Sequence, residues 1–177
     1  MKRLYLLRHG QTEFNVKKLV QGRCDSPLTD LGRQQAGMAA TWIKSHNVVP
    51  DKVVSSPLGR AMDTARLVAT ELLGPDAAVE PCEGIIERCY GTFEEGPHDA
   101  LPTDVWDPGE DLVPFGGEGN RALQERMVGT LTNLMGAEGI ETLLAVSHGS
   151  ASRQFIKAAA PEGFELPTKL PNCAIMI

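Results

Sequence analysis

The 177-residue sequence lacks the features of a membrane protein and of a nucleic-acid-binding protein. No run of apolar residues approaches the length of a membrane-spanning helix. Basic residues are in the minority, with 17 Lys and Arg against 23 Asp and Glu and a net charge of −6. Because an acidic surface repels nucleic acid and anionic lipid, we expect neither nucleic acid nor a membrane as a partner.

Metal-binding and redox cysteine motifs are missing as well. No two of the four cysteines are separated by two residues, and no histidine lies at ligand spacing from them. We therefore expect reduced thiols that pack as small apolar groups, with no metal and no cofactor. The apolar run near the N-terminus is too short for an export signal, which favours a first buried strand and a cytoplasmic protein. The cysteines are Cys24, Cys82, Cys89 and Cys173.

Internal repeats and domain linkers are also absent, and the length favours one domain over residues 1–177 with a sizeable core. Short apolar stretches alternate with stretches in which apolar residues recur every three to four positions. This alternation predicts an α/β fold with three layers, α/β/α, around a mainly parallel central sheet. Strands are expected at residues 3–8, 51–55, 77–80, 141–147 and 171–177, and helices at 31–46, 57–74, 122–135 and 150–159, with a short helix after the loop 10–15.

Three of the predicted strands lead into Arg or His side chains. The stretch LYLLRHG carries Arg8 and His9 at the end of the first strand, and LLAVSHG carries His148 at the end of a later one. Between them, the strand that ends near Ser55 leads into a helix that begins near Arg60. In open α/β sheets, ligands bind at the carboxyl ends of the strands. We therefore expect these four charged or imidazole side chains to converge on one site.

The residue types at this site favour phosphoryl chemistry. Alone, each arginine would be interpreted as a surface charge and each histidine as a core residue bonded to a carbonyl group. Two guanidinium groups with paired donors suit a phosphoryl group better than a carboxylate. A neutral imidazole accepts a phosphoryl group, and a second imidazole donates a hydrogen bond to it. A metal held by the two histidines is the alternative, but no carboxylate or third histidine lies at short spacing to complete the site.

A general acid and a cap are expected in the following part of the chain. A glutamate close to a bound phosphate is kept protonated by like-charge repulsion and burial, so it can donate a proton to a leaving group. The residues alone do not single out one glutamate. The segment at about 97–119 has four prolines and exceeds an ordinary connection in length, so we expect a short functional cap loop. The candidate acids are Glu83, Glu87, Glu94 and Glu95.

The order of the motifs resembles that of the histidine phosphatase superfamily, the phosphoglycerate-mutase-like proteins. The motifs are LRHGQTEFN, QGRCDSPLTDLG, SSPLGRAMDTA, ERCYGTFEEG, FGGEG and VSHG. Any one of them is a weak signal, but their combination is highly specific. The resemblance extends from the first strand to the C-terminal NCAIMI, and it implies a single histidine phosphatase domain with the phosphoglycerate-mutase-like fold.

The resemblance also implies roles for particular residues. His9 matches the nucleophile that forms a phosphohistidine, and Arg8, Arg60 and His148 match the pocket that holds the phosphoryl group without a metal. Glu87, at the matching place in ERCYG, resembles the proton donor that later serves as the base for water. The positions that resemble substrate-binding residues are Asn15, Gln21, Gly22, Arg88, Tyr90 and Gly149.

The composition of the cap favours a phosphatase over a mutase. Between Glu87 and the GGE motif the chain is short and acidic, with no Lys or Arg after Arg88, whereas the mutase branch has a longer and more basic insertion. We expect a metal-independent phosphomonoesterase that acts on a small phosphorylated metabolite. The alternatives are a cofactor-dependent phosphoglycerate mutase and a non-catalytic domain that binds a phosphorylated ligand.

The acidity of the cap bears on the substrate as well. It predicts a sugar, cobalamin-precursor or nucleoside-type monophosphate rather than a bisphosphate. Within the cap, His98 and Trp106 are candidate pocket residues. The oligomeric state stays open, with a homodimer as one expectation.

Overall fold

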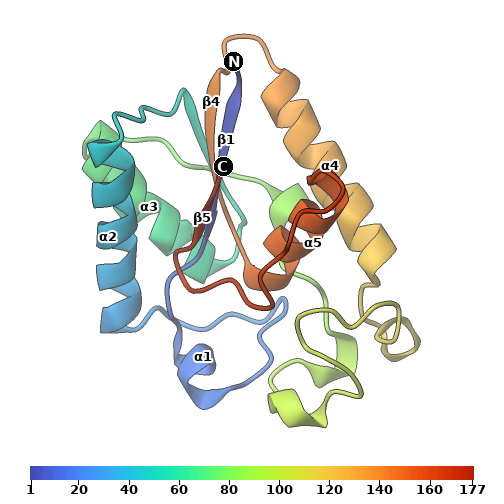
Figure 1. Ribbon diagram of the computed structural model, residues 1–177. Coiled ribbons are helices and arrows are strands. Elements are labelled where there is room, and N and C mark those ends of the chain that lie inside the picture. Colours follow the sequence, from blue (N-terminus) through green and yellow to red (C-terminus); the bar gives the residue numbers. More distant parts are fainter.

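The computed structural model describes residues 1–177 and contains a five-stranded sheet between two layers of helices (Figure 1). The three-layer α/β fold predicted from the sequence is confirmed. The strands are β1 (Arg3–Arg8), β2 (Lys52–Ser55), β3 (Glu80–Pro81), β4 (Thr142–Ser147) and β5 (Ile175–Met176). The helices are α1 (Glu13–Lys17), α2 (Asp30–Ser45), α3 (Gly59–Leu73), α4 (Asn120–Gly136) and α5 (Gly149–Ala159). None of them is both long and apolar enough to span a membrane.

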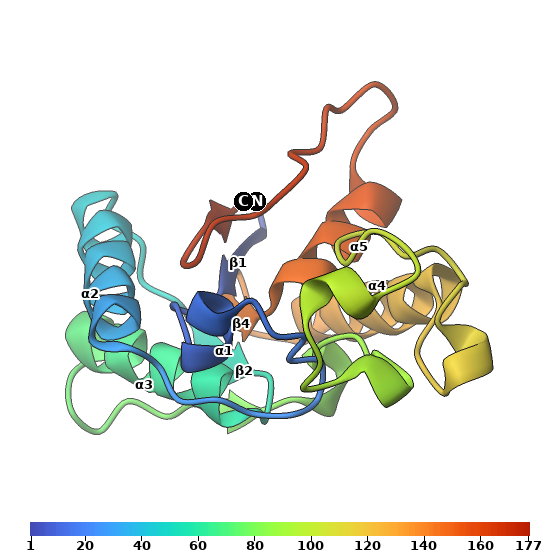
Figure 2. The same cartoon turned by 90° about the horizontal axis from the view of Figure 1, so that it is seen from below.

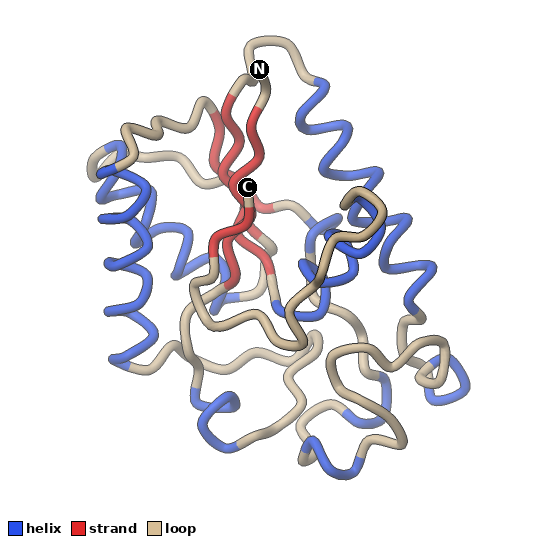
Figure 3. The backbone as a smooth tube through the Cα atoms, in the orientation of Figure 1, coloured by secondary structure: helices blue, strands red, loops and turns tan.

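The strand order in the sheet is β3-β2-β4-β1-β5. Figure 3 shows the strands in red at the centre, with helices on either side of them. β4 pairs in parallel with both β1 and β2, and β2 pairs in parallel with β3. Only β5 runs antiparallel, along the outer edge of β1. The parallel pairing brings the carboxyl ends of β1, β2 and β4 to the same edge of the sheet, which is the lower edge in Figure 1.

Both faces of the sheet are covered, and the side chains of β4 show how. Leu144 and Val146 point into a core shared with α2 and α3, whereas Leu143 and Ala145 point into a core shared with α4 and α5. Figure 2, seen from below, shows the two helical layers on opposite sides of the strands. Burial on both faces explains why β4 is apolar at all positions between its two ends.

The helix predicted at residues 31–46 agrees with the observed bounds of α2 to within one residue at each end. The Thr29 hydroxyl caps it by accepting a hydrogen bond from the Gly32 N–H at 3.0 Å. The apolar positions at helical spacing lie against the sheet, as the pattern predicts. The buried members of this face are Ala36, Ala39, Ala40 and Ile43.

Two edge strands are shorter than predicted. The strand expected at 77–80 pairs only at Glu80 and Pro81, where the proline has no N–H to extend the ladder. The strand expected at 171–177 pairs only at Ile175 and Met176, because the chain turns before it. Cys173 adopts a left-handed conformation with φ of 55°, which an extended strand does not accommodate.

The cap segment 97–119 lies beside the carboxyl edge of the sheet, where it is coloured yellow-green in Figure 1. It contains two short 3₁₀ turns, His98–Ala100 and Val113–Phe115, and otherwise irregular chain. A small apolar cluster holds it against the rest of the molecule. The buried members of that cluster are Val20, Tyr90, Leu101 and Leu112.

Candidate active site

A small pocket lies at the carboxyl edge of the sheet. Its volume is about 60 Å³, well below the roughly 300–1,000 Å³ of clefts that enclose drug-sized ligands. Its lining includes all of the predicted site residues except His148 and Arg88. The predicted residues in the lining are Arg8, His9, Asn15, Gln21, Gly22, Arg60, Glu87, Tyr90 and Gly149.

His9 follows β1 directly, and its ring is fixed by the next residue along the chain. Nδ1 of His9 lies 2.7 Å from the carbonyl oxygen of Gly10, and the side chain is only 2% exposed. Gly10 in turn packs so closely on α2 that a Cβ atom there would lie 2.4 Å from the carbonyl oxygen of Gly32. Only glycine allows this close approach, so the orientation of the His9 ring depends on the two glycines.

His148 lies behind His9 at the end of β4. The two rings are 5.1 Å apart between centroids and meet edge to face. Nε2 of His148 lies 2.7 Å from Oγ of Ser56, and its buried Nδ1 has no hydrogen-bond partner. Burial lowers the pKa of both histidines well below 6.5, and the positive charges of Arg60 and Arg8 lower both further. Both imidazoles are therefore neutral at physiological pH.

Arg8 is the last residue of β1, and its guanidinium group lies at the pocket. One of its terminal nitrogens donates to the carbonyl oxygen of Leu170, and its buried Nε has no partner. Burial lowers the pKa of Arg8 to about 10, against the opposing effect of the Glu87 carboxylate. The side chain therefore keeps its positive charge at neutral pH.

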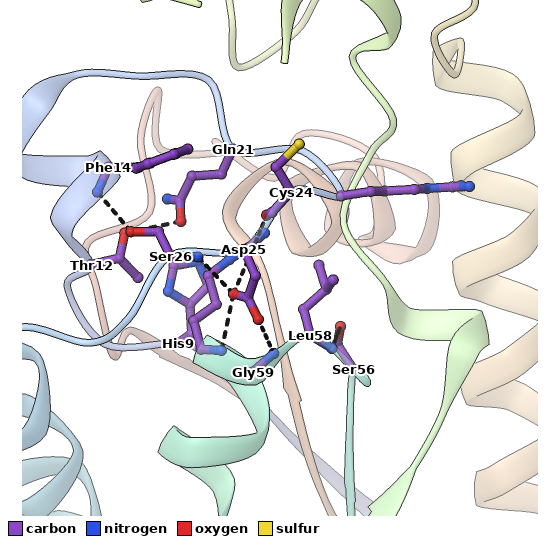
Figure 4. A network of polar contacts seen from close by, with 12 residues as sticks. His9, Thr12, Phe14, Gln21, Cys24, Asp25, Ser26, Ser56, Leu58 and Gly59 are labelled. Atoms are coloured by element: carbon purple, nitrogen blue, oxygen red, sulfur yellow. Dashed lines mark hydrogen bonds and ion pairs between the residues drawn. The ribbon is translucent and has the colours of Figure 1, made fainter. Parts of the chain in front are cut away.

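Arg60 is held at the start of α3 by the loop that precedes α2. Its terminal nitrogens donate to the carbonyl oxygens of Gly22 and Cys24, both at 2.7 Å, while its buried Nε has no partner. Asp25 accepts hydrogen bonds from the N–H groups of Gly59 and Arg60 and pairs with the Arg60 guanidinium at 3.2 Å. Figure 4 shows Asp25 beside Gly59, where it caps α3. The pocket thus contains two guanidinium groups, and the buried Nε donor of each is unpaired.

Glu87 supplies the carboxylate of the pocket, and three backbone N–H groups fix it. One oxygen accepts from the N–H groups of Ala151 and Arg88, both at 2.8 Å, and the other accepts from the N–H group of Ser150 at 3.2 Å. Two of these donors belong to the first turn of α5, where the helix dipole favours a carboxylate. The other three candidate glutamates do not line the pocket, so the structure distinguishes Glu87 where the sequence did not.

Asn15 and Gln21 present amide donors to the pocket. The Asn15 side-chain oxygen accepts hydrogen bonds from the Thr12 N–H at 3.1 Å and from the Asn172 amide at 3.2 Å. The Gln21 side-chain oxygen accepts from the Thr12 hydroxyl at 3.0 Å, as Figure 4 shows. In both residues the oxygen is occupied, which leaves the amide N–H groups available to an anion.

Tyr90 and Arg88 differ from each other in where they point. Tyr90 lines the pocket, and its hydroxyl donates to the carbonyl oxygen of Val105 at 2.7 Å. Arg88 is fully buried outside the pocket, where its donors bind Ser150 Oγ, Glu118 O and Asn120 Oδ1. The expectation that Arg88 reaches the substrate is therefore corrected: its guanidinium group is engaged within the protein.

The cap contributes Trp106 and His98 to the pocket wall, as the sequence suggested. The centroid of the Trp106 ring lies 5.1 Å from the guanidinium carbon of Arg8. A Cβ atom at Gly149 would lie only 2.6 Å from the edge of this ring, so the indole and the start of α5 are in close contact. Four further wall residues belong to no predicted set, and their only signal in the sequence is a position one or two residues from Gln21, Trp106 or Gly149. They are Leu19, Val20, Val105 and Ser150.

No acidic residue of the cap lines the pocket. Asp107 accepts hydrogen bonds from Asn120, Gln154 and Lys157, which tie the cap to α4 and α5. Glu94, which precedes the cap, accepts hydrogen bonds from backbone N–H groups and from the Cys24 thiol. Glu87 is therefore the one carboxylate in the pocket wall.

The arrangement suits the transfer of a phosphoryl group. Neutral imidazoles, two guanidinium groups, amide donors and a single carboxylate surround a space of small volume. No three His, Cys, Asp or Glu side chains gather in the geometry of metal ligands.

Comparison with known proteins gives consistent matches over nearly the whole chain. Residues 4–177 match the model of the histidine phosphatase superfamily, branch 1. A broad-specificity phosphatase from Saccharomyces cerevisiae is 32% identical over 158 residues, which are 88% of this chain and 69% of that protein. A probable phosphoglycerate mutase from Escherichia fergusonii is 32% identical over 184 residues, 99% of this chain and 83% of that protein. The structure of phosphoserine phosphatase from Entamoeba histolytica with phosphoserine matches with a TM-score of 0.78 and 30% identity, covering 99% of this chain and 89% of that one.

Proposed function

Because the chain belongs to the histidine phosphatase superfamily, we propose that it is a metal-independent phosphomonoesterase that hydrolyses a small phosphorylated metabolite in the cytoplasm. The observation that carries the proposal is the hydrogen bond from His9 Nδ1 to the Gly10 carbonyl oxygen. A carbonyl oxygen only accepts, so Nδ1 carries the proton and Nε2 keeps its lone pair. A neutral imidazole beside two guanidinium groups is suited to attack a phosphoryl group.

In the first step, His9 Nε2 attacks phosphorus and the bond from phosphorus to the leaving oxygen breaks. Glu87, which takes up a proton when the phosphate dianion binds beside it, gives that proton to this oxygen, which leaves as an alcohol. The unpaired Nε donors of Arg8 and Arg60 stabilise the charge on the transferring group. When the Ser56 hydroxyl donates to His148 Nε2, the unpaired Nδ1 of His148 carries a proton and donates to the same group.

In the second step, water attacks the phosphohistidine. Glu87 takes a proton from this water, the bond from phosphorus to His9 Nε2 breaks, and inorganic phosphate leaves. Glu87 ends protonated and His9 neutral, so the starting state is restored. The backbone N–H groups that fix the Glu87 carboxylate keep it in place for both proton transfers.

A cofactor-dependent phosphoglycerate mutase is the second candidate, favoured by the similarity to probable phosphoglycerate mutases. A mutase must hold a substrate with two anionic groups and shield the phosphoenzyme from water. Arg8 and Arg60 are the only arginines in the pocket wall, and Arg88 is engaged elsewhere. Because the pocket wall has only these two arginines to bind anionic groups, it favours the phosphatase.

Release of phosphate from a panel of phosphomonoesters tests the proposal. The assay contains a chelator and compares the wild type with His9→Ala. We expect chelator-resistant turnover that the substitution abolishes. Interconversion of phosphoglycerates that depends on their bisphosphate, without net phosphate release, would favour the mutase, and the absence of both activities would favour a non-catalytic phosphate-binding domain.

A further inference from the structure

Glu118, the glutamate of the FGGEG motif, lies outside the pocket. It forms a bidentate salt bridge with Arg126 of α4. Its two carboxylate oxygens accept from Nε and Nη2 of Arg126 at 2.9 and 2.7 Å. Both side chains are mostly shielded from water, with 12% of Glu118 and 21% of Arg126 exposed. A two-point contact in this setting fixes the plane of the guanidinium group as well as its position.

The third nitrogen of the same guanidinium group reaches the segment that carries Glu87. Nη1 of Arg126 donates to the carbonyl oxygens of Gly84 and Ile86, at 3.0 and 2.9 Å. Ile86 directly precedes Glu87, so this contact fixes the chain on the N-terminal side of the proposed acid.

The backbone of Glu118 fixes the chain on the other side. Its carbonyl oxygen accepts from Arg88 Nη1 at 2.7 Å, and its N–H group donates to the carbonyl oxygen of Cys89 at 2.8 Å. Arg88 also donates to Ser150 Oγ, and the Ser150 N–H group binds the Glu87 carboxylate. Glu118 therefore contacts the C-terminal flank of Glu87 directly and reaches the N-terminal flank through Arg126, without touching Glu87 itself.

These contacts compensate for the absence of regular structure. Residues 86–90 belong to no helix or strand, so no regular hydrogen-bond ladder sets the position of Glu87. We propose that Glu118 and Arg126 are positioning residues that hold Glu87 at the leaving-group oxygen. The inference rests on the proposed phosphatase function, in which Glu87 is the general acid.

The leaving group distinguishes this role from a general effect on folding. An alkyl phosphate needs a proton on its leaving oxygen, whereas p-nitrophenolate leaves well without one. The ratio kcat/KM reports the steps up to formation of the phosphohistidine and excludes its later hydrolysis. A displaced Glu87 therefore lowers kcat/KM for an alkyl phosphate and leaves kcat/KM for p-nitrophenyl phosphate nearly unchanged.

The test measures both substrates with Arg126→Lys and Glu118→Gln, using the best alkyl substrate of the phosphomonoester panel. Lysine keeps the charge of Arg126 but cannot hold Glu118 and two carbonyl oxygens together. Arg121→Lys is the matched control, because Arg121 is exposed on the same helix and its side chain makes no hydrogen bond or ion pair. Thermal unfolding of each variant checks that the protein is folded at the assay temperature.

We expect kcat/KM for the alkyl phosphate to fall at least about tenfold in both variants, within the range of general acid catalysis, and kcat/KM for p-nitrophenyl phosphate to change less than about twofold. Arg121→Lys should change neither. An equal loss on both substrates, or no loss on either, would overturn the inference while the proposed function stands. A wild type that hydrolyses no phosphomonoester would overturn both.

Discussion

Nδ1 of His9 lies 2.7 Å from the carbonyl oxygen of Gly10, and this single contact sets the chemistry of the ring. The proton is held on Nδ1, so Nε2 is the atom that forms the bond to phosphorus. The position of the Gly10 carbonyl oxygen depends on the close contact between Gly10 and Gly32.

Gly10→Ala therefore tests how the nucleophile is oriented. The added methyl group would meet the Gly32 carbonyl oxygen at 2.4 Å and displace the backbone beside His9. We expect a loss of about 1–3 kcal/mol in the free energy of unfolding and a fall in kcat/KM. Gly37→Ala is the control, because Gly37 lies on the exposed side of α2 with open space around it and should gain stability. Equal effects of the two substitutions would contradict the account of His9.

The buried histidines predict a loss of stability in mild acid. The pKa of His9 and of His148 is well below 6.5 in the folded protein and near 6.5 in the unfolded chain. As pH falls through 6.5, the unfolded chain binds protons that the folded protein does not, so folding stability is lost. Each histidine contributes a slope of up to about 1.4 kcal/mol per pH unit.

Urea unfolding between pH 7.5 and 5.5 measures this slope. The half-buried His98, whose pKa is also lowered by burial, acts in the same direction and makes the slope steeper. His148→Gln should reduce the slope by the share of one histidine. A wild-type unfolding free energy that stays constant over this range would show that the histidines are not held neutral.

From the contacts of Asp25 we predict that the cap of α3 and the orientation of Arg60 in the pocket depend on the same carboxylate. Its carboxylate caps α3 at Gly59 and pairs with the Arg60 guanidinium. Asp25→Ala should cost about 0.5–2 kcal/mol of stability through the lost cap and raise KM, because Arg60 loses a partner that orients it. Asp25→Asn keeps the capping oxygen and removes the charge, so it should restore most of the stability. Urea unfolding and steady-state kinetics of the two variants separate the cap from the ion pair.

From the position of Trp106 we predict how the cap limits the size of the substrate. The indole lies against Arg8 and Gly149 at the wall of a very small pocket. Trp106→Ala should lower kcat/KM for a small alkyl phosphate and raise it for naphthyl phosphate, changing their ratio by about tenfold or more. Trp106→Phe, which keeps an aromatic ring, should change the ratio less. If the ratio of the two kcat/KM values were unchanged in Trp106→Ala, the substrate would not bind against Trp106.

The sequence was sufficient for the features that depend on strand ends. Arg8 ends β1, His9 follows it directly, and His148 follows β4, so the parallel pairing of β1 with β4 brings them together. The apolar spacing of α2 and the Thr29 cap also followed from local patterns. These predictions succeed because periodicity and capping act over a few neighbouring residues.

Other features depend on contacts between distant segments, which no local pattern encodes. Arg88 appeared to be a substrate residue, but partners 30 to 62 positions away engage its guanidinium group. Glu87 differs from the neighbouring glutamates in lining the pocket, where N–H groups of the distant α5 bind its carboxylate. Asp107 of the cap likewise binds side chains of α4 and α5, which no local pattern predicts.

Detection of a phosphohistidine tests the central claim most directly. The Glu87→Gln variant, in which attack by water is slowed, is mixed with p-nitrophenyl phosphate in the presence of a chelator, quenched in alkali and analysed by mass spectrometry. The account predicts one phosphoryl group on His9 that is stable in alkali, lost in acid and absent from the double variant with His9→Ala. Turnover by the wild type without any phosphorylated His9, or turnover retained in His9→Ala alone, would contradict it.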